Sequence, residues 1–361
     1  MQRRTFLGAV VVVGPLAGCM QAPVQVTAPA GIGAMPALPS GALRRIAFGS
    51  CIDQTRLQPI WAPILDERPD LFIFGGDNVY ASTAPWSREK LEQAYATLAA
   101  NPGFARLRGT VAHLATWDDH DYGLNDGGAG FTGQEASKDA FLAFWGAGAD
   151  DPRRARPGVY HALRVGPTGR QVQIILLDGR TFRAALRRTD QPMAPGRERY
   201  LPDPDPAKTL LGDAQWAWLE QQLRQSADLR LIVSGVQVLA EGHGWECWGN
   251  LPRERQRLLD LIGHTRANGV VFLSGDRHVG AFYRHQPAGG YPLYEVTSSG
   301  MTHAWAQASE DDPNRIGDLV RSNHYASIDI DWSARALRIA LKDTFGALLR
   351  ELPLALADLA T

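Results

Sequence analysis

The sequence lacks a strong net charge, long apolar runs and internal repeats. Its 361 residues carry a formal net charge of -1, so its charge gives no sign of a nucleic-acid-binding surface. After residue 20, no run reaches the roughly 18 apolar residues that a membrane-spanning helix needs. The chain is 45% hydrophobic and 21% charged, which is ordinary for a globular protein. Its length allows one large α/β domain or two small ones.

Cysteine is also scarce, with three residues in the whole chain. Outside the cytoplasm, the simplest expectation for Cys51 and Cys247 is a disulfide bond between them. Cys51, however, follows a predicted strand and has other potential metal ligands in similar positions elsewhere in the chain. We therefore favour a metal-binding thiolate at Cys51, with a plain buried thiol as the remaining alternative.

The first 43 residues predict an export signal and a tether. Arg3 and Arg4 precede a short apolar stretch, an order that resembles a twin-arginine signal read by the twin-arginine export machinery. The sequence ending at Cys19 resembles a lipobox, whose cysteine is acylated; an ordinary secretory signal is the alternative. We expect residues 1–19 to be a lipoprotein signal and residues 20–43 to be a flexible tether. The protein would be exported folded to the periplasm or cell surface and anchored to the membrane through Cys19.

The rest of the chain alternates strand, polar cluster and helix, which predicts one α/β domain over residues 44–353. Apolar runs predict strands over 44–51, 70–74, 111–117, 171–177, 229–233 and 270–273. Helical spacing predicts helices over 57–68, 87–101, 137–145, 212–226 and 253–268. Alternation over 327–342 predicts a pair of strands with one exposed face. Residues 188–209 predict a long loop, a kind of segment that is usually functional.

Potential metal ligands follow four of the predicted strands. In chain order they are Cys51; Asp77 and Tyr80; Asp118, Asp119 and His120; and Asp276 and His278. In an open α/β sheet such strand ends converge on one edge. Carboxylates packed together there repel one another unless cations lie between them. Four such endings in one domain therefore indicate a metal centre.

Single members of this set have simpler explanations. An aspartate after a strand often caps the next helix, which is the alternative for Asp77 and Asp118. A histidine at a strand end is often only a hydrogen-bonding group, although the Asp-x-His spacing favours a ligand at His278. Five other histidines, at 113, 161, 264, 285 and 324, have no supporting context, and we expect them to be structural.

Together the motifs resemble the alkaline phosphatase D (PhoD-like) family of the metallophosphoesterase superfamily. The residues that carry the resemblance are Phe48-Gly49-Ser50-Cys51, Gly76-Asp77-Asn78-Val79-Tyr80, Trp117-Asp118-Asp119-His120 and Gly275-Asp276-Arg277-His278. The second motif is also similar to the Gly-Asp-x-x-Tyr motif of purple acid phosphatases. One departure is the lack of the separate N-terminal β-domain that some family members carry.

The resemblance implies a four-layer αββα sandwich with two mixed β-sheets flanked by helices. It implies a phosphohydrolase, a phosphodiesterase or alkaline phosphatase, that cleaves phosphate esters with a metal-activated water. Cys51, Tyr80 and His278 would hold Fe(III), and Asp77 would bridge to a second metal. Asp119 and Asp276, helped by Asn125, would hold that second metal. Oxygen ligands favour Ca(II) there, with Mn(II), Mg(II) or Zn(II) as alternatives.

The resemblance also assigns catalytic roles. His120 would contact phosphate and either stabilise the transition state or protonate the leaving oxygen, and Asp118 or Asp121 would orient His120. Arg180 is either a phosphate clamp or part of a structural ion pair. His243 and Gln237 are weaker candidates for contacts with metal or phosphate.

The expected partners are a phosphate-ester substrate and, through the lipid, a membrane, and we expect a monomer. Two other functions stay open. One is a phospholipase D-like lipid hydrolase, which the membrane anchor favours. The other is a catalytically inactive lipoprotein that binds metal or phosphate.

Overall fold

The computed structural model describes residues 36–360. The predicted export signal and most of the predicted tether therefore lie outside the described residues. Leu43, near the end of the predicted tether, is fully buried. The packed chain continues past residue 353, because the last strand ends at Ala355 and Leu359 is fully buried as well.

One sheet has six strands in the order β15-β14-β13-β1-β2-β3. Strands β1, β2 and β3 are parallel, and the other neighbours are antiparallel. β2 has no polar side chain and is buried along its whole length, as expected of a parallel strand covered on both faces. The bounds are β1 Arg45–Gly49, β2 Leu71–Gly75, β3 His113–Thr116, β13 His324–Asp331, β14 Ala336–Asp343 and β15 Leu348–Ala355.

The other large sheet has seven strands in the order β12-β10-β11-β9-β8-β5-β4. Its four central strands, β11, β9, β8 and β5, are parallel. The bounds are β4 His161–Val165, β5 Val172–Leu176, β8 Leu229–Ser234, β9 Val270–Ser274, β10 Gly280–His285, β11 Leu293–Ser298 and β12 Arg315–Val320. The predicted loop carries a small hairpin of β6, Arg187–Arg188, and β7, Tyr200–Leu201.

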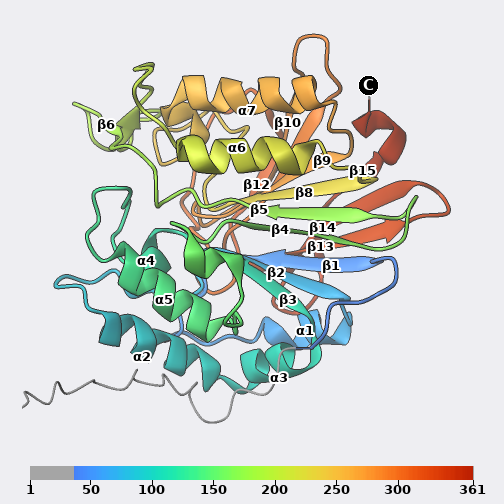
Figure 1. Cartoon of the computed structure of the whole chain (residues 1–361), viewed down its shortest axis with the longest axis horizontal. Coiled ribbons are helices and arrows are strands. Elements are labelled where there is room, and N and C mark those ends of the chain that lie inside the picture. Colours follow the sequence, from blue (N-terminus) through green and yellow to red (C-terminus); the bar gives the residue numbers. More distant parts are fainter. Residues whose placement is uncertain (1–35, 361) are drawn as a thin grey trace, which may run out of the picture.

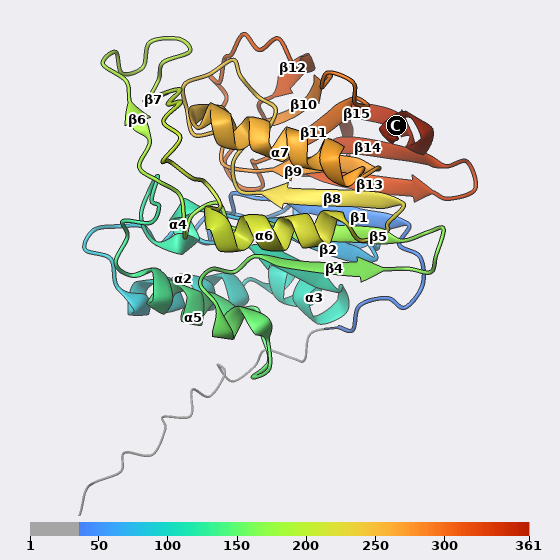
Figure 2. The same cartoon turned by 45° about the horizontal axis from the view of Figure 1, so that its top comes forward.

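Helices cover the outer face of each large sheet (Figure 1). Those on the six-stranded sheet are α1 Trp61–Asp66, α2 Arg88–Ala99, α3 Pro102–Thr110, α4 Asp119–Tyr122 and α5 Gln134–Phe144. Those on the seven-stranded sheet are α6 Gly212–Leu223 and α7 Pro252–Thr265. Figure 2 shows the same four layers from a second direction. The expected αββα sandwich of two mixed sheets is thus confirmed.

The predicted strands and helices all form, with shifts at their ends. Ser87 caps α2 as its position suggests, with its side chain accepting from the Lys90 amide. The predicted helix over 57–68 is shorter, because α1 begins only at Trp61. The additional elements α3, α4, β4, β6, β7, β10, β11, β12 and β15 were not predicted. None of the described helices is long and apolar enough to cross a membrane.

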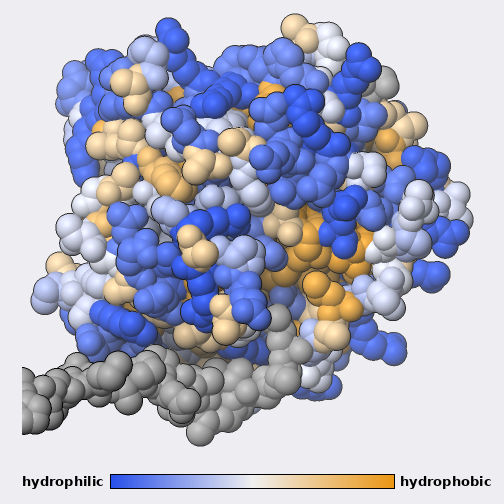
Figure 3. Space-filling model, viewed as in Figure 1, coloured by the Kyte–Doolittle hydropathy of each residue, from blue (hydrophilic) through white to orange (hydrophobic). Residues whose placement is uncertain are grey.

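The helical layer beneath the six-stranded sheet is held by an aromatic cluster. The Trp61 ring lies 5.6 Å from that of Phe104, and the Phe74 ring lies 4.7 Å from that of Trp145. Each such buried ring contributes roughly 1.5–3 kcal/mol of transfer free energy. This packing fixes β2, and with it the residues that follow β2, against the helices. The outer surface in Figure 3 is mostly hydrophilic, with one apolar area on the right at the level of the sheets.

Candidate metal centre

The potential ligands meet at one end of the two large sheets. Strands β1, β2, β3 and β9 end just before them, and in Figure 1 the arrowhead of β1 points to the left, where this end lies. Ligand atoms of Cys51, Asp77 and His278 lie within 4.8 Å of one another. Those of Asp119 and Asp276 lie within the same limit of each other. The structure therefore brings together residues that are more than 200 positions apart in the sequence.

The first cluster contains the softer and aromatic ligands. Cys51 Sγ lies 3.6 Å from Asp77 Oδ2. The Tyr80 hydroxyl lies 3.3 Å from the same oxygen and 3.0 Å from His278 Nε2. A thiol, a phenol, an imidazole and a carboxylate thus surround one point, which is the donor set expected around Fe(III) from the sequence.

The second cluster contains carboxylates, and Asp77 lies next to it as well. Asp77 groups with Asp119 and His120 within 4.8 Å, and its Oδ1 accepts a 3.1 Å bond from the His120 amide. Asp119 accepts from the Asp126 amide through Oδ2, while its buried Oδ1 has no hydrogen-bond partner among the described residues. An unpartnered buried carboxylate oxygen beside further carboxylates fits a cation. Asp77 is positioned to serve both clusters.

Four of the ligand candidates have left-handed backbone conformations. The φ angles are 62° at Cys51, 49° at Asp77, 67° at Asp276 and 55° at His278. Each such residue costs of order 1–2 kcal/mol relative to an ordinary conformation. Strain of this kind gathers at functional sites, and here it occurs at three residues of the first ligand cluster and at Asp276 of the second.

Steric constraints explain why a glycine precedes the aspartate in the Gly-Asp-x-x-Tyr sequence. Gly76 has φ +104°, and a Cβ there would lie 2.6 Å from Asp118 Cβ. Any other residue would push apart β2 and β3, because those strands deliver Asp77 and Asp118 side by side.

The electrostatics of the clusters also indicate cations. Burial, with Asp119 as the next contribution, raises the pKa of Asp77 well above its usual value, and burial raises that of the Cys51 thiol to about 12. Burial likewise raises the pKa of Asp276 well above its usual value and lowers that of His278 to about 3. The ionised forms of these groups are therefore unfavourable in the buried site unless an opposite charge lies beside them. A bound cation supplies it by favouring the anionic carboxylates and thiolate and the neutral imidazole.

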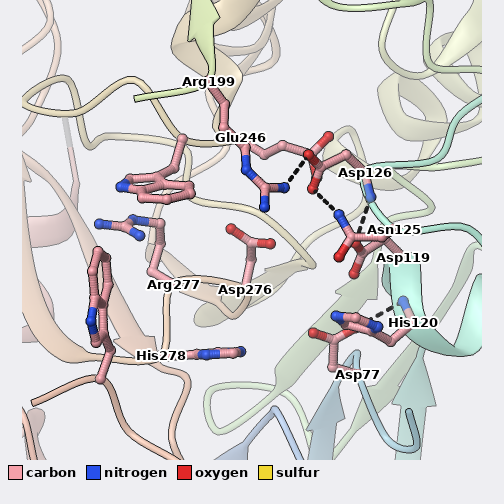
Figure 4. A pocket seen from close by; sticks show the side chains of 12 residues that line it. Asp77, Asp119, His120, Asn125, Asp126, Arg199, Glu246, Asp276, Arg277 and His278 are labelled. Carbon is pink, nitrogen blue, oxygen red and sulfur yellow. Dashed lines mark hydrogen bonds and ion pairs between the residues drawn. The ribbon is translucent and has the colours of Figure 1, made fainter. Parts of the chain in front are cut away.

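A pocket opens over the two clusters (Figure 4). Asn125 lies at its edge and donates from Nδ2 to Asp126 Oδ1 at 2.9 Å. Ten of the lining residues are polar or charged and the other two are tryptophans. They are Asp77, Asp119, His120, Asn125, Asp126, Arg199, Trp245, Glu246, Asp276, Arg277, His278 and Trp305. Cys51 is fully buried against Asp77, and Tyr80 is partly buried beside it.

His120 lies in the pocket as expected, but its orienting partner is different. Its Nδ1 shares a 2.6 Å hydrogen bond with Ser82 Oγ. Asp121 instead accepts from Asn78, and Asp118 pairs with Arg180. The expected orienting role of Asp118 or Asp121 is therefore not seen, because both carboxylates are committed to other partners.

Arg180 is not positioned as a phosphate clamp. Its side chain is 0% exposed and its guanidinium contacts Asp118 and Glu246 at 2.6 and 2.7 Å. It is absent from the pocket lining, and the structural ion pair is the alternative that the geometry supports. Two other arginines, Arg199 and Arg277, reach the pocket. Arg199 comes from the predicted long loop, and Arg277 from within the Gly-Asp-x-His sequence.

Two weaker candidates also lie outside the pocket lining. His243 Nε2 shares a 2.8 Å hydrogen bond with Gln237 Oε1, so each side chain is a hydrogen-bond partner of the other.

The two described cysteines, Cys51 and Cys247, are both free, and a disulfide between them is excluded.

His303 was missed by the sequence-based reasoning. Its ring lies 4.8 Å from that of Tyr80 and 4.4 Å from that of His278. His303 lies outside the four motifs that carry the family resemblance, and no signal in the sequence marks it.

The four-layer sandwich with two ligand clusters at the ends of its parallel strands defines a metal-dependent phosphoesterase. Residues 47–326 match the profile of the PhoD-like phosphatase family, and the chain belongs to that family. It is a hydrolase that acts on phosphoric esters, and its family implies divalent metal binding. No curated protein matches the sequence.

Solved structures show the same fold at low sequence identity. A structure of PhoD superposes with a TM-score of 0.65 at 17% identity, over 88% of this chain and 73% of that one. Purple acid phosphatase PPD1 from yellow lupin (Lupinus luteus) seeds gives 0.58 at 12%, over 89% and 55%. GAP50, the anchor in the inner membrane complex of Plasmodium, gives 0.56 at 11%, over 87% and 89%. At these identities the likeness concerns the fold alone.

Proposed function

We propose that the protein is a phosphodiesterase with additional phosphomonoesterase activity. It works with Fe(III) held by Cys51, Tyr80 and His278 and with Ca(II) held by Asp119 and Asp276. The observation that carries this proposal is the position of Asp77 between a thiol–phenol–imidazole cluster and a carboxylate cluster. Hard oxygen ligands suit Ca(II), and a thiolate with a phenolate suits the more strongly polarising iron.

Two cations bound there supply Lewis-acid stabilisation of the phosphate oxygens and increase the acidity of the attacking water. The protein's own part is to hold them at the ends of rigid strands. Asp77 would serve as a ligand of both, because its Oδ2 faces Tyr80 and its Oδ1 faces His120. Asn125 offers a further oxygen at the carboxylate side.

His120 supplies the acid–base function in this proposal. The bond between its Nδ1 and Ser82 Oγ fixes the ring and leaves Nε2 for the substrate. The Tyr80 ring, 4.1 Å away between centroids, packs against the imidazole. A proton on Nε2 passes to the leaving oxygen as the ester bond breaks, which stabilises the developing alkoxide.

The pocket lining does not favour a lipid hydrolase. An enzyme that binds acyl chains needs aliphatic surface beside the reacting phosphate, and no aliphatic side chain is among the lining residues. We therefore place the substrate among polar phosphodiesters.

The proposal also covers the export, the membrane attachment and the oligomeric state of the enzyme. We propose export of the folded protein, and attachment to the membrane by acylation of Cys19, on the basis of the sequence alone. A monomer is proposed as well. Mass spectrometry of the natively exported protein tests the attachment, since a lipid-modified N-terminal peptide beginning at Cys19 is expected.

The proposed function is tested on natively exported protein by elemental analysis, an absorption spectrum and hydrolysis of bis-p-nitrophenyl phosphate. We expect iron, a second metal and a visible charge-transfer band from thiolate or phenolate on Fe(III). Cys51→Ser should remove iron and shift or remove the band. Cys247→Ser is the matched control, a buried free thiol outside the clusters, and should keep both. Metal-loaded protein without hydrolysis of the diester or of p-nitrophenyl phosphate would refute the proposal.

A further inference from the structure

One wall of the pocket is not used by the proposed chemistry. In Figure 4, Arg277 lies across the pocket from Asp77 and His120. Trp245 and Trp305 belong to the same lining. These two rings stand at 90° with centroids 5.5 Å apart. The Arg277 guanidinium lies 5.6 Å from the Trp245 ring centre, so this side of the pocket is aromatic and basic.

The tryptophan wall is held by the backbone. The Trp245 amide donates to His243 Nδ1 at 3.2 Å, and His243 continues into a buried hydrogen bond with Gln237. The Trp305 amide donates to the carbonyl oxygen of His278 at 2.7 Å. The wall is therefore fixed relative to a ligand of the metal centre, and any group that rests on it has a defined distance from the phosphate.

The free polar atoms of this wall are all hydrogen-bond donors. Arg277 is only 4% exposed, and its Nε and Nη2 have no hydrogen-bond partner among the described residues. Trp245 and Trp305 are only partly buried, so their indole N–H groups are open to water or to a ligand. The two buried donors of Arg277 are costly without partners, and a ligand that accepts from them removes this cost.

The positive charges of the wall are largely compensated. Arg199 pairs with Asp126 at 2.5 Å, and Arg277 lies 3.6 Å from the buried carboxylate of Glu310. The wall therefore suits a neutral, flat group with acceptor atoms better than a second anion. It also disfavours a cationic head group such as choline, because the Trp245 ring already has Arg199 at 5.3 Å and Arg277 at 5.6 Å from its centre.

We propose that the Trp245–Trp305–Arg277 wall binds the base of a nucleoside phosphate ester. This inference rests on the proposed function and specifies its substrate class. The base stacks on the Trp305 ring, because the Trp245 ring already has two arginines over it, and its ring nitrogens and carbonyl oxygens accept from the free N–H groups. Such stacking strengthens binding roughly 5- to 150-fold per base.

The test compares inhibitors of bis-p-nitrophenyl phosphate hydrolysis in initial-rate assays. Adenosine 5′-monophosphate and ribose 5-phosphate share the sugar and phosphate and differ only in the base. We expect the metal-loaded enzyme to bind the nucleotide about tenfold or more tightly than the sugar phosphate. Phosphocholine should bind more weakly than ribose 5-phosphate. Because the ratio is taken within one protein, any change in metal loading or folding cancels.

Two variants localise the effect. Trp305→Leu should bring the ratio of the two inhibition constants to within about twofold, since it removes a stacking surface. Trp218→Leu is the control, because that tryptophan packs on Tyr160 away from the pocket, and it should keep the wild-type ratio. A ratio near one in the wild-type enzyme, or one that neither Trp305→Leu nor Trp245→Leu reduces, overturns the subsite while the phosphodiesterase activity stands. Absence of hydrolysis overturns the proposed function and, with it, this inference.

Discussion

Asp118 and Arg180 form a fully buried ion pair in which Arg180 Nε donates to Asp118 Oδ1 at 2.6 Å. Arg180 also donates to Glu246 at 2.7 Å, and Arg183 lies 2.9 Å from the other oxygen of Glu246. The network connects the end of β3, the loop after β5 and the loop that carries Trp245. Three segments next to the pocket are thus tied together by charges that are almost completely buried.

Replacing Arg180 should therefore cost stability before it affects phosphate binding. Arg180→Met leaves Asp118 and Glu246 buried without their partner, and we expect a loss of about 3–5 kcal/mol in the free energy of unfolding. Urea denaturation measures it. Arg88→Met, in the exposed pair with Glu92, should change stability by less than about 1 kcal/mol. Unchanged stability together with a selectively raised KM would restore the phosphate-clamp interpretation.

Asp77→Asn should abolish activity and lower metal content in both clusters. Asparagine tolerates the left-handed backbone at this position, so the substitution removes the charge and leaves the turn. Elemental analysis and hydrolysis of bis-p-nitrophenyl phosphate give the result. The metal-free variant should be at least as stable as metal-free wild type, because a carboxylate is removed from a crowded, buried cluster. Near-normal turnover would contradict the bridging role.

The sequence was sufficient for six of the parallel strands, β1, β2, β3, β5, β8 and β9, and for the ligands that follow four of them, but not for the parallel strand β11. Strands such as β2 are continuous apolar runs, and Asp77 or Asp276 comes immediately after such a run. The antiparallel strands were harder to identify. β4 is only partly buried apart from Val165, so its sequence lacks a clear apolar run. β12 has two consecutive exposed residues in the middle of its six, so its sequence lacks the alternation of apolar and polar residues that marks a strand.

The pocket contacts were harder still, because they depend on loop geometry. Nothing in the sequence places Ser82 beside His120 or Arg199 over Trp245. Arg180 comes after a strand, but nothing in the sequence indicates that it is buried and paired with two carboxylates. Side chains that follow strands directly were predictable, and those delivered by loops were not.

Stability should fall on acidification between pH 6.5 and 4. Burial lowers the pKa of His324 from 6.5 to about 4. Below pH 6.5 the unfolded chain therefore binds a proton that the folded chain does not, and this costs up to roughly 3 kcal/mol by pH 4. Above pH 6.5 both states are neutral and the effect is absent. Burial shifts the pKa of His113 in the same direction, also to about 4.

His324→Asn isolates one part of this pH dependence. The asparagine amide can replace the Nδ1–H group that contacts the Ser322 carbonyl at 2.7 Å. We expect the variant to lose some stability at pH 8 through poorer packing, and to lose less than wild type as the pH falls from 6.5 to 4. Denaturation curves at several pH values measure the difference, in which metal effects common to both proteins cancel. Parallel curves for the two proteins would contradict the assignment.

Variants of His120 and of Ser82 distinguish the catalytic role of the imidazole from the role of the serine in positioning it. His120→Ala should retain both metals, since the proposal assigns no metal ligand to the imidazole and its Nδ1 is hydrogen-bonded to Ser82, and it should lower kcat by roughly 10²–10⁴-fold. Ser82→Ala keeps the imidazole and removes only the 2.6 Å bond to Nδ1. It should therefore lower kcat by less than His120→Ala and shift its pH profile, because the tautomer is no longer fixed. Equal losses in the two variants would make Ser82 a catalytic group in its own right, and a loss of metal from His120→Ala would make this histidine a ligand.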